Sequence, residues 1–293
     1  MKKLIGFLRL TRPANIVTAI SDILAGAAIA GYAGGMTELP AVLLLILATI
    51  GLYGGGVVFN DVFDAALDRL ERPERPIPSG LITEKEGAFL GTSLLIVGVA
   101  AAFGVAAYPS GMIAFAIAVA ALIYDKWGKH HLILGPLNMG LCRGLNLLLG
   151  ISVMPDAMFQ YGYFAVIPII YIAAITMISR GEVHGGKSKT ILFAAFLYLV
   201  VIVSILYVSI AQGNSAYALF FLVILAIFIY PPLLKAFREP VGRNIGKAVR
   251  AGVLALIVMN ASWAAAFGAV YLALLIVLLL PVSILLAKLF AVT

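Results

Sequence analysis

Ten apolar segments separated by short polar connections divide this chain. They lie near 14–34, 40–60, 87–107, 109–124, 132–153, 161–179, 190–211, 215–235, 246–267 and 269–290. A helix needs about 20 mainly apolar residues to cross a bilayer. Because the fourth segment is short and the last two nearly touch, the pattern predicts nine or ten transmembrane helices. No connection is long enough for a soluble domain, so we expect residues 1–293 to form a single all-α transmembrane domain.

The composition supports a membrane protein over a soluble one. Hydrophobic residues make up 63% of the chain and charged residues 11%, whereas a soluble domain has about 25% charged residues. The lipid bilayer is therefore an expected partner. The single cysteine, Cys142, excludes an internal disulfide framework. The first apolar segment has no small-residue cleavage site, so we interpret it as a retained span.

The basic residues gather in alternate connections. Of the 20 lysines and arginines, all except Arg143 and Lys288 lie at the N-terminus or in every second connection. Four connections contain none: 34–40, 108–111, 155–161 and 212–215. Since cytoplasmic loops carry an excess of Lys and Arg, the N-terminus is expected in the cytoplasm, and a bacterial inner membrane fits this bias. The charge pattern also explains the net charge of +7 without a nucleic-acid partner.

An acidic motif follows the second apolar segment. Asp61, Asp64 and Asp68 have the spacing i, i+3, i+7, which places three carboxylates on one helix face, and Asn60 precedes them. Like charges this close repel one another, so a cation is expected among them. Carboxylate oxygens of this kind suit Mg²⁺, which characteristically binds one or two carboxylates together with substrate phosphate oxygens. The four residues are therefore predicted metal ligands.

Two arginines follow the acidic motif. Arg72 and Arg75 carry guanidinium groups that match phosphate geometry, and Pro73, Pro76 and Pro78 stiffen the loop between them. Carboxylates for a metal followed by arginines for an anion describe a clamp for a metal and a diphosphate. The alternative interpretation is a solvated loop that only anchors the topology.

These motifs resemble the UbiA-type intramembrane prenyltransferases. The resemblance rests on the Asn60–Asp68 motif, on Arg-Pro-x-x-Ser-Gly at 75–80, and on segments at 12–15, 124–129, 137–140 and 143–144. It implies an all-α bundle of about nine spans around a central cavity. It also implies that Mg²⁺ helps to ionise an isoprenyl diphosphate and that the allylic cation passes to an acceptor, usually an aromatic one.

The loop at 178–190 departs from that family's second aspartate-rich motif. It contains no aspartate; Glu182 is its only carboxylate, and His184 follows it. Either Glu182 binds a second Mg²⁺, or one metal suffices and Arg180 with Lys187 neutralises phosphate charge. A third alternative is that ionisation no longer occurs. This loop and Pro13–Gly26 resemble the EboC branch, which accompanies gene clusters linked to precursor export of secondary metabolites.

Several polar residues lie inside predicted spans, where such groups usually face a cavity or a partner. Asp22 shares a helix face with Asn15 and Thr18. It is expected either to orient or deprotonate the acceptor, or to pair with another polar side chain. Arg143 is expected to line the cavity, where it would reach the diphosphate or neutralise Asp22. Asn15 and, in the loop at 178–190, His184 are also expected to line the cavity. Asn138 and Asn146 would line the cavity or bond neighbouring helices.

The working hypothesis is Mg²⁺-assisted transfer of a prenyl group from an isoprenyl diphosphate to a small-molecule acceptor. The negative charge on the departing diphosphate would be neutralised by Arg72, Arg75, Lys126 and Lys187. A CDP-alcohol phosphotransferase is disfavoured because its Asp-Gly-x-x-Ala-Arg signature is absent. The second hypothesis is a catalytically silent carrier of a lipid or metabolite, associated with export. Release of pyrophosphate would distinguish the two.

Overall fold

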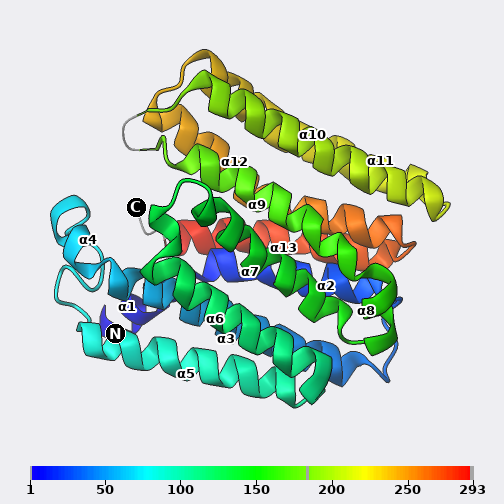
Figure 1. The fold of residues 1–293 in the computed structure, drawn as a ribbon, viewed down its shortest axis with the longest axis horizontal. Coiled ribbons are helices and arrows are strands. Elements are labelled where there is room, and N and C mark those ends of the chain that lie inside the picture. Colours follow the sequence, from blue (N-terminus) through cyan, green and yellow to red (C-terminus); the bar gives the residue numbers. More distant parts are fainter. Residues whose placement is uncertain (1, 183–184, 291–293) are drawn as a thin grey trace.

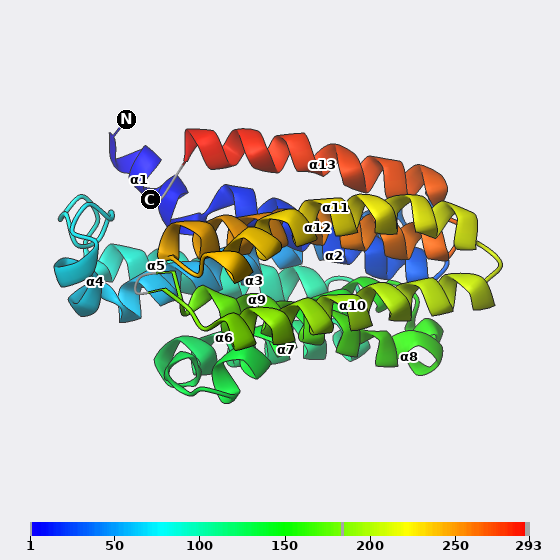
Figure 2. The same ribbon diagram turned by 90° about the horizontal axis from the view of Figure 1, so that it is seen from above.

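The computed structural model describes residues 2–182 and 185–290, without the side chain of His130. Throughout these residues the elements are helical and no strand is present. The long helices run along one another as an elongated bundle, with α10 and α11 on one flank and α5 on the other (Figure 1; Figure 2). The all-α membrane bundle predicted from the apolar segments is confirmed in its class.

The helical elements follow the predicted segments closely. They are α1 (Lys2–Thr11), α2 (Pro13–Ile29), α3 (Leu39–Phe63), α4 (Ala65–Glu71), α5 (Glu84–Phe103), η1 (Ala107–Gly111), α6 (Met112–Lys126), η2 (Gly128–His130), α7 (Leu134–Ile151), α8 (Pro155–Tyr161), η3 (Gly162–Ala165), α9 (Val166–Ser179), α10 (Ser188–Ala211), α11 (Ser215–Arg238), α12 (Gly242–Ala266) and α13 (Val270–Leu289). The first segment was expected to reach residue 34. It ends at Ile29 because the chain turns at Gly31 and Gly34, whose φ angles are 96° and 97°.

Eight helical stretches within the described residues are long and apolar enough to cross a membrane. The predicted number of nine or ten is therefore not confirmed. The two predicted segments outside this set form α2, which has 17 residues, and α7. The helix α2 falls outside the set by its length, as a shorter apolar helix. In α7 the buried Arg143 and Asn146 lower the mean hydropathy, since central helices need not be uniformly apolar.

The centre of the bundle is formed where α2 packs against α3, α7, α12 and α13. A Cβ atom at Gly26 would lie 2.4 Å from the carbonyl oxygen of Leu147, and one at Gly150 would lie 2.5 Å from that of Ile23. Only glycine permits this approach of α2 and α7, as small residues do between membrane helices. Every residue of α12 from Ala255 to Ala266 is buried. This packing sets Asp22 of α2 beside the polar side chains of α7 and α12.

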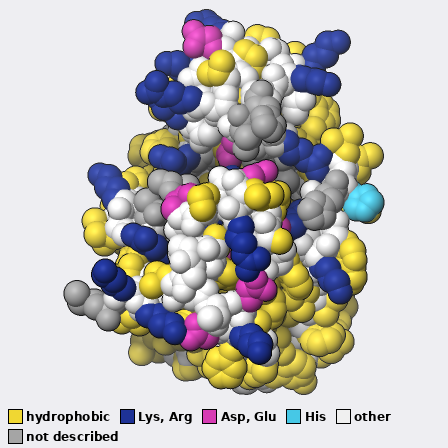
Figure 3. Space-filling model, turned by 90° about the vertical axis from the view of Figure 1, so that its left-hand side faces the viewer, with side chains coloured by type: hydrophobic (Ala, Val, Ile, Leu, Met, Phe, Trp, Pro, Cys, Tyr) yellow, Lys and Arg dark blue, Asp and Glu magenta, His cyan; other side chains and the backbone are white. Residues whose placement is uncertain are grey.

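One end of the bundle carries most of the charge. Figure 3 shows this end, where Lys and Arg side chains surround a smaller number of Asp and Glu side chains, with hydrophobic side chains below them. The helix α4 and the turn between α1 and α2 lie at this end (Figure 1). The acidic motif is therefore at the charged end of the bundle and not in its apolar middle.

Candidate functional site

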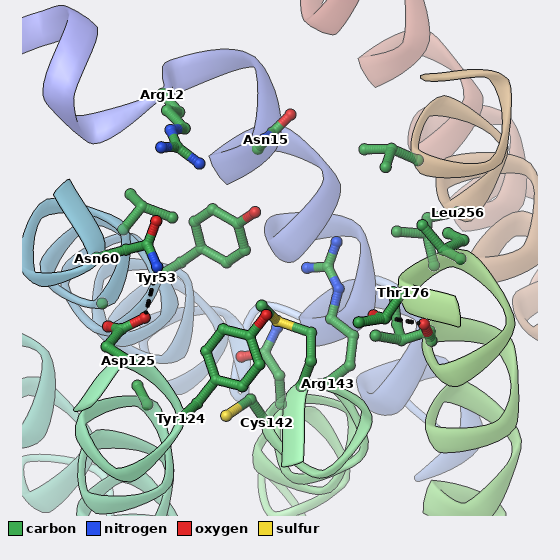
Figure 4. A pocket seen from close by; sticks show the side chains of 18 of the residues that line it. Arg12, Asn15, Tyr53, Asn60, Tyr124, Asp125, Cys142, Arg143, Thr176 and Leu256 are labelled. Carbon is green, nitrogen blue, oxygen red and sulfur yellow. Dashed lines mark hydrogen bonds between the residues drawn. The ribbon is translucent and has the colours of Figure 1, made fainter. Parts of the chain in front are cut away.

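A cavity of about 370 Å³ lies between α2, α3, α6, α7, α9 and α12. Its wall is mainly apolar, with residues such as Leu52, Val57, Ile175, Val253 and Leu256. Polar side chains enter it at two levels. Figure 4 shows Arg12, Tyr53, Tyr124 and Arg143 directed toward the same space, with Asn60 and Asp125 on one side of it.

The first polar level joins the end of α3 to the end of α6. Asn60 donates a hydrogen bond of 3.0 Å to one carboxylate oxygen of Asp125, drawn as a dashed line in Figure 4. Asp125 is 4% exposed. Its other carboxylate oxygen is buried with no hydrogen-bond partner among the described residues, and the same holds for one oxygen of Asp61. Unpartnered buried carboxylate oxygens are costly, so they indicate a place for a cationic ligand.

The three motif aspartates are neutralised by cations of the chain itself. Asp61 pairs with Arg12 at 2.5 Å and with Arg75 at 3.4 Å. Asp68 also pairs with Arg75, at 2.7 Å, and Asp64 pairs with Lys129 at 2.5 Å. The repulsion expected among the three carboxylates is thus offset without a metal. Arg75 is held in a buried bridge between two aspartates.

The donor set at this end nevertheless fits Mg²⁺. Within the described ranges, no three His, Cys, Asp or Glu side chains are arranged as a complete metal site. Mg²⁺, however, needs only one or two carboxylates when phosphate oxygens and water supply its other ligands. The unpartnered oxygen of Asp125 and the amide oxygen of Asn60 are hard donors at the cavity wall, and Asp61, next to Asn60 in the chain, has a further unpartnered oxygen. A metal that arrives with a diphosphate would find its protein ligands there.

Arg12 presents its guanidinium from a strained turn. Its φ of 48° lies in the left-handed region, and no other non-glycine residue in the described part of the chain has a positive φ. This turn joins α1 to α2, and the side chain lines the cavity while it pairs with Asp61. Such strain is retained where surrounding contacts hold the residue in place. The Arg-Pro dipeptide at 12–13 was the available signal, but the sequence alone assigned it no role in the site.

The loop after α9 forms the opposite wall of this first level. Glu182 lines the cavity, together with Thr176 and Ser179 of α9. Arg180 is exposed and donates a 2.5 Å hydrogen bond to the carbonyl oxygen of His131, so it ties two loops together. Lys187 is exposed at the start of α10. His184, a predicted cavity residue, lies outside the described residues.

Glu182 is a partly buried acid near two arginines. Burial raises its pKa above the ordinary value of 4.5, and the nearby charges of Arg72 and Arg250 oppose this rise. An acid whose pKa is raised in the folded state stabilises that state fully below the pKa of the unfolded chain. The stabilisation is lost as the pH rises through the folded pKa.

We therefore expect a pH-dependent difference between the wild-type protein and Glu182→Gln. Above about pH 5 the melting temperature of the wild type should fall relative to that of the variant, which cannot ionise. Thermal unfolding in detergent across a pH series measures this difference. A constant difference at all pH values would show that Glu182 titrates normally.

The second polar level lies deeper, where α2, α3, α7 and α12 meet. Asp22 is fully buried and accepts hydrogen bonds from Asn146 at 2.9 Å and from Asn260 at 2.7 Å. Its carboxylate also lies 3.0 Å from Nη1 of Arg143. Arg143 and Asn146 line the cavity, and Asp22 is not among the lining residues. Of the two expectations for Asp22, the structure shows the pairing with other polar side chains.

The cavity wall contains some of the predicted site residues and leaves others out. Those that line it are Asn15, Asn60, Arg143, Asn146 and Glu182. Asn138 does not: in the amide orientation that satisfies both of its groups, it donates to the carbonyl of Ala120 and accepts from the N–H of Tyr124, each at 3.2 Å. It therefore bonds α7 to α6. The other predicted residues absent from the wall are Asp22, Asp61, Asp64, Asp68, Arg72, Arg75, Lys126, Arg180 and Lys187.

Near the end of α6, Lys129 takes the place that was expected for Lys126, and Asp125 takes a place that the sequence did not assign. Lys126 lies 4.6 Å above the ring of Trp127 and is exposed, whereas Lys129 reaches Asp64. Asp125, which received no role from the sequence, holds the unpartnered oxygen at the cavity. The only sequence signal for Asp125 was its place in the Tyr-Asp-Lys-Trp-Gly-Lys segment. Tyr53 and Tyr124 also line the cavity and were not predicted to do so.

Comparison with known proteins gives concordant matches. Residues 21–239 match the family described as the UbiA prenyltransferase family. The chain is 34% identical over 132 residues to the digeranylgeranylglyceryl phosphate synthase of Methanosarcina barkeri, which covers 45% of each protein. It is 29% identical over 185 residues to the synthase of that name from Ignicoccus hospitalis, covering 62% of this chain and 59% of the relative. The match thus spans less than half of the first relative and less than two thirds of the second.

Solved structures share the fold. A structure described as concerning digeranylgeranylglyceryl phosphate synthase in membranes superposes with a TM-score of 0.66 at 22% identity, covering 92% of this chain and 100% of that one. A UbiA homolog from Archaeoglobus fulgidus bound to GPP and Mg²⁺ gives a TM-score of 0.62 at 14% identity, covering 86% and 99%. At these identities the likeness concerns the fold.

Proposed function

Because the chain belongs to the UbiA prenyltransferase family, we propose that it transfers a prenyl group from an isoprenyl diphosphate to an acceptor within the membrane. The observation that carries this proposal is the first polar level of the cavity. There the unpartnered oxygen of Asp125, the amide of Asn60 and the guanidinium of Arg12 border an otherwise apolar space. A diphosphate head and a hydrocarbon chain need these two environments side by side.

The proposed reaction breaks the C–O bond between the allylic carbon and the diphosphate, and the electron pair leaves with the diphosphate. Mg²⁺ bound at Asn60, Asp61, Asp64 and Asp125 would supply positive charge to the leaving group. Arg12 and Lys129 would add to this stabilisation. The rings of Tyr53 and Tyr124 face the cavity and would stabilise the allylic cation, while the apolar wall excludes water.

The acceptor would complete the reaction with a lone pair. The synthase name of the relatives describes a glyceryl phosphate with two geranylgeranyl groups, which favours an alcohol over an aromatic ring. The alcohol oxygen would bond to the allylic carbon, and its proton would pass to the departing diphosphate. The same name favours lipid synthesis over secondary metabolism and does not single out the EboC-like branch.

We also propose that α2 and α7 cross the membrane together with the eight longer stretches, giving ten spans in a single domain. The alternation of basic and uncharged connections supports this number and a cytoplasmic position for the charged end. The relatives are archaeal, so the bacterial membrane expected from the charge bias stays a prediction.

Pyrophosphate release tests the proposed function. Purified protein supplied with geranyl diphosphate and a mixture of 1-O-hexadecylglycerol and 1-O-hexadecylglycerol 3-phosphate as acceptors should release pyrophosphate with Mg²⁺, and a chelator should stop the release. Asp64→Asn removes a carboxylate beside the first polar level and should lower the rate by at least about tenfold. Because Asp64 is partly exposed, the variant should still fold.

The exposed Glu71, on α4, provides the matched control. Glu71→Gln removes the same type of charge and should retain the wild-type rate. Protein that binds geranyl diphosphate but releases no pyrophosphate would instead support the silent carrier. Equal rates for the wild type and Asp64→Asn would remove this aspartate from the site.

A further inference from the structure

The second polar level of the cavity is not used by the proposed departure of diphosphate. It consists of Arg143, Asn146 and Thr49 at the wall, with Asp22 and Asn260 behind them. Asn146 accepts a 2.8 Å hydrogen bond from Thr49 and donates to Asp22. Arg143 also donates to the hydroxyl of Thr18. The network connects four helices inside the bundle.

This level lies well below the first. Asp22 follows Pro13, the first residue of α2, by nine residues. At 1.5 Å per residue, Asp22 is about 14 Å further along α2 than Pro13, and on α3 Thr49 is about 16 Å from Asn60. Thr49 and its partner Asn146 are therefore beyond the reach of a diphosphate bound by Arg12 and Asp125. The two levels therefore serve different chemical groups.

The prenyl chain is a poor occupant for the deeper level. An isoprenyl chain is hydrocarbon and offers no hydrogen-bond partner. Nη1 of Arg143 is buried and lies 3.0 Å from the Asp22 carboxylate, so the ion pair occupies it. The side chain is 6% exposed, and its guanidinium lies 5.4 Å from the centre of the Tyr53 ring. Arg143 and Asn146 still line the cavity, and an oxygen atom of a ligand satisfies such polar groups better than hydrocarbon does.

The net charge of the network determines whether a charged or a neutral oxygen of a ligand can bind there. Asp22 and Arg143 carry one negative and one positive charge, and the other members are amides and hydroxyls, so the sum is zero. A phosphate brought to this depth would lose its hydration and meet no net positive charge to compensate it. A neutral oxygen loses much less hydration and still gains the donor of Arg143.

We propose that the Arg143 level is the acceptor site and that it selects a neutral, hydroxyl-bearing acceptor over a phosphate-bearing one. The inference rests on the proposed function, because it assigns the second substrate of that reaction. Arg143 is the specificity-determining residue, and Asp22 is a positioning residue that sets the charge of the site. Tyr53 holds the guanidinium plane from the cavity side.

Two probes that differ only in a phosphate test this inference. The protein is given geranyl diphosphate and Mg²⁺ with either 1-O-hexadecylglycerol or 1-O-hexadecylglycerol 3-phosphate, and the geranylated product is measured. The wild type should prefer the uncharged alcohol in kcat/KM. Asp22→Asn leaves the charge of Arg143 uncompensated, so the preference should shift toward the phosphate by about tenfold or more. In the double variant Asp22→Asn with Arg143→Gln, the polar network again has no net charge. The preference in kcat/KM should therefore return to the uncharged alcohol.

A purely structural network would change thermal stability and leave the ratio of the two probes unaltered. Where Asp22→Asn does not fold, Tyr53→Leu is measured, and it should raise KM for the alcohol. Absence of pyrophosphate release by the wild type would refute the proposed function itself. Release with a preference for the phosphate probe, with transfer to neither probe, or with an unchanged ratio in Asp22→Asn or an unchanged KM in Tyr53→Leu, would overturn the acceptor assignment alone.

Discussion

Replacing Asp125 with asparagine is expected to lower Mg²⁺-dependent pyrophosphate release by about 100-fold or more. Asparagine has nearly the same shape, so the hydrogen bond from Asn60 can be kept. The carboxylate charge is lost, and with it the buried oxygen that has no partner in the described chain. Initial rates at saturating geranyl diphosphate, over a series of Mg²⁺ concentrations, measure the effect. The Mg²⁺ concentration for half-maximal rate should rise in the same variant.

Asp156 offers the matched control for this substitution. It is exposed on α8, at the far end of the bundle from the acidic motif (Figure 1). Asp156→Asn should therefore leave both the rate and the Mg²⁺ dependence unchanged. A wild-type Mg²⁺ response in Asp125→Asn would show that the metal is held by the motif aspartates without help from α6.

Arg75→Gln is expected to destabilise the folded protein by about 3–5 kcal/mol. Arg75 is 8% exposed and bridges Asp61 and Asp68, so its loss leaves two buried carboxylates without their shared cation. The bridge ties the loop before α5 to the end of α3. Thermal or denaturant unfolding in detergent measures the change, which should be far larger than the effect of an exposed substitution.

Arg72→Gln is the companion variant. Arg72 is half-buried, it forms no ion pair with the described residues, and its charge acts on Glu182. Its loss should reduce pyrophosphate release by about tenfold and leave the stability nearly unchanged. Equal losses of stability in Arg72→Gln and Arg75→Gln would contradict the division of roles between the two arginines.

The sequence by itself determined the class of the fold and the end of the bundle that carries the acidic motif. An apolar segment long enough to cross the bilayer is a local property of the sequence, because each helix in lipid must form its backbone hydrogen bonds within itself. The apolar segments therefore predicted the helices well, including α10 to α13. The spacing of Asn60, Asp61, Asp64 and Asp68 was likewise sufficient to indicate a polar helix end suited to a metal and an anion.

Only the tertiary structure decided which of the charged side chains reach the cavity. Asp68 and Arg75 match the expected motif but neutralise each other in a buried bridge, whereas Asp125 keeps a free oxygen at the wall. Lys129 and not Lys126 meets the motif. Asp22 pairs with Arg143 and does not itself line the cavity. Ion pairing joins residues far apart in the sequence, and its outcome depends on the packing of α2, α3, α6 and α7, which no local pattern specifies.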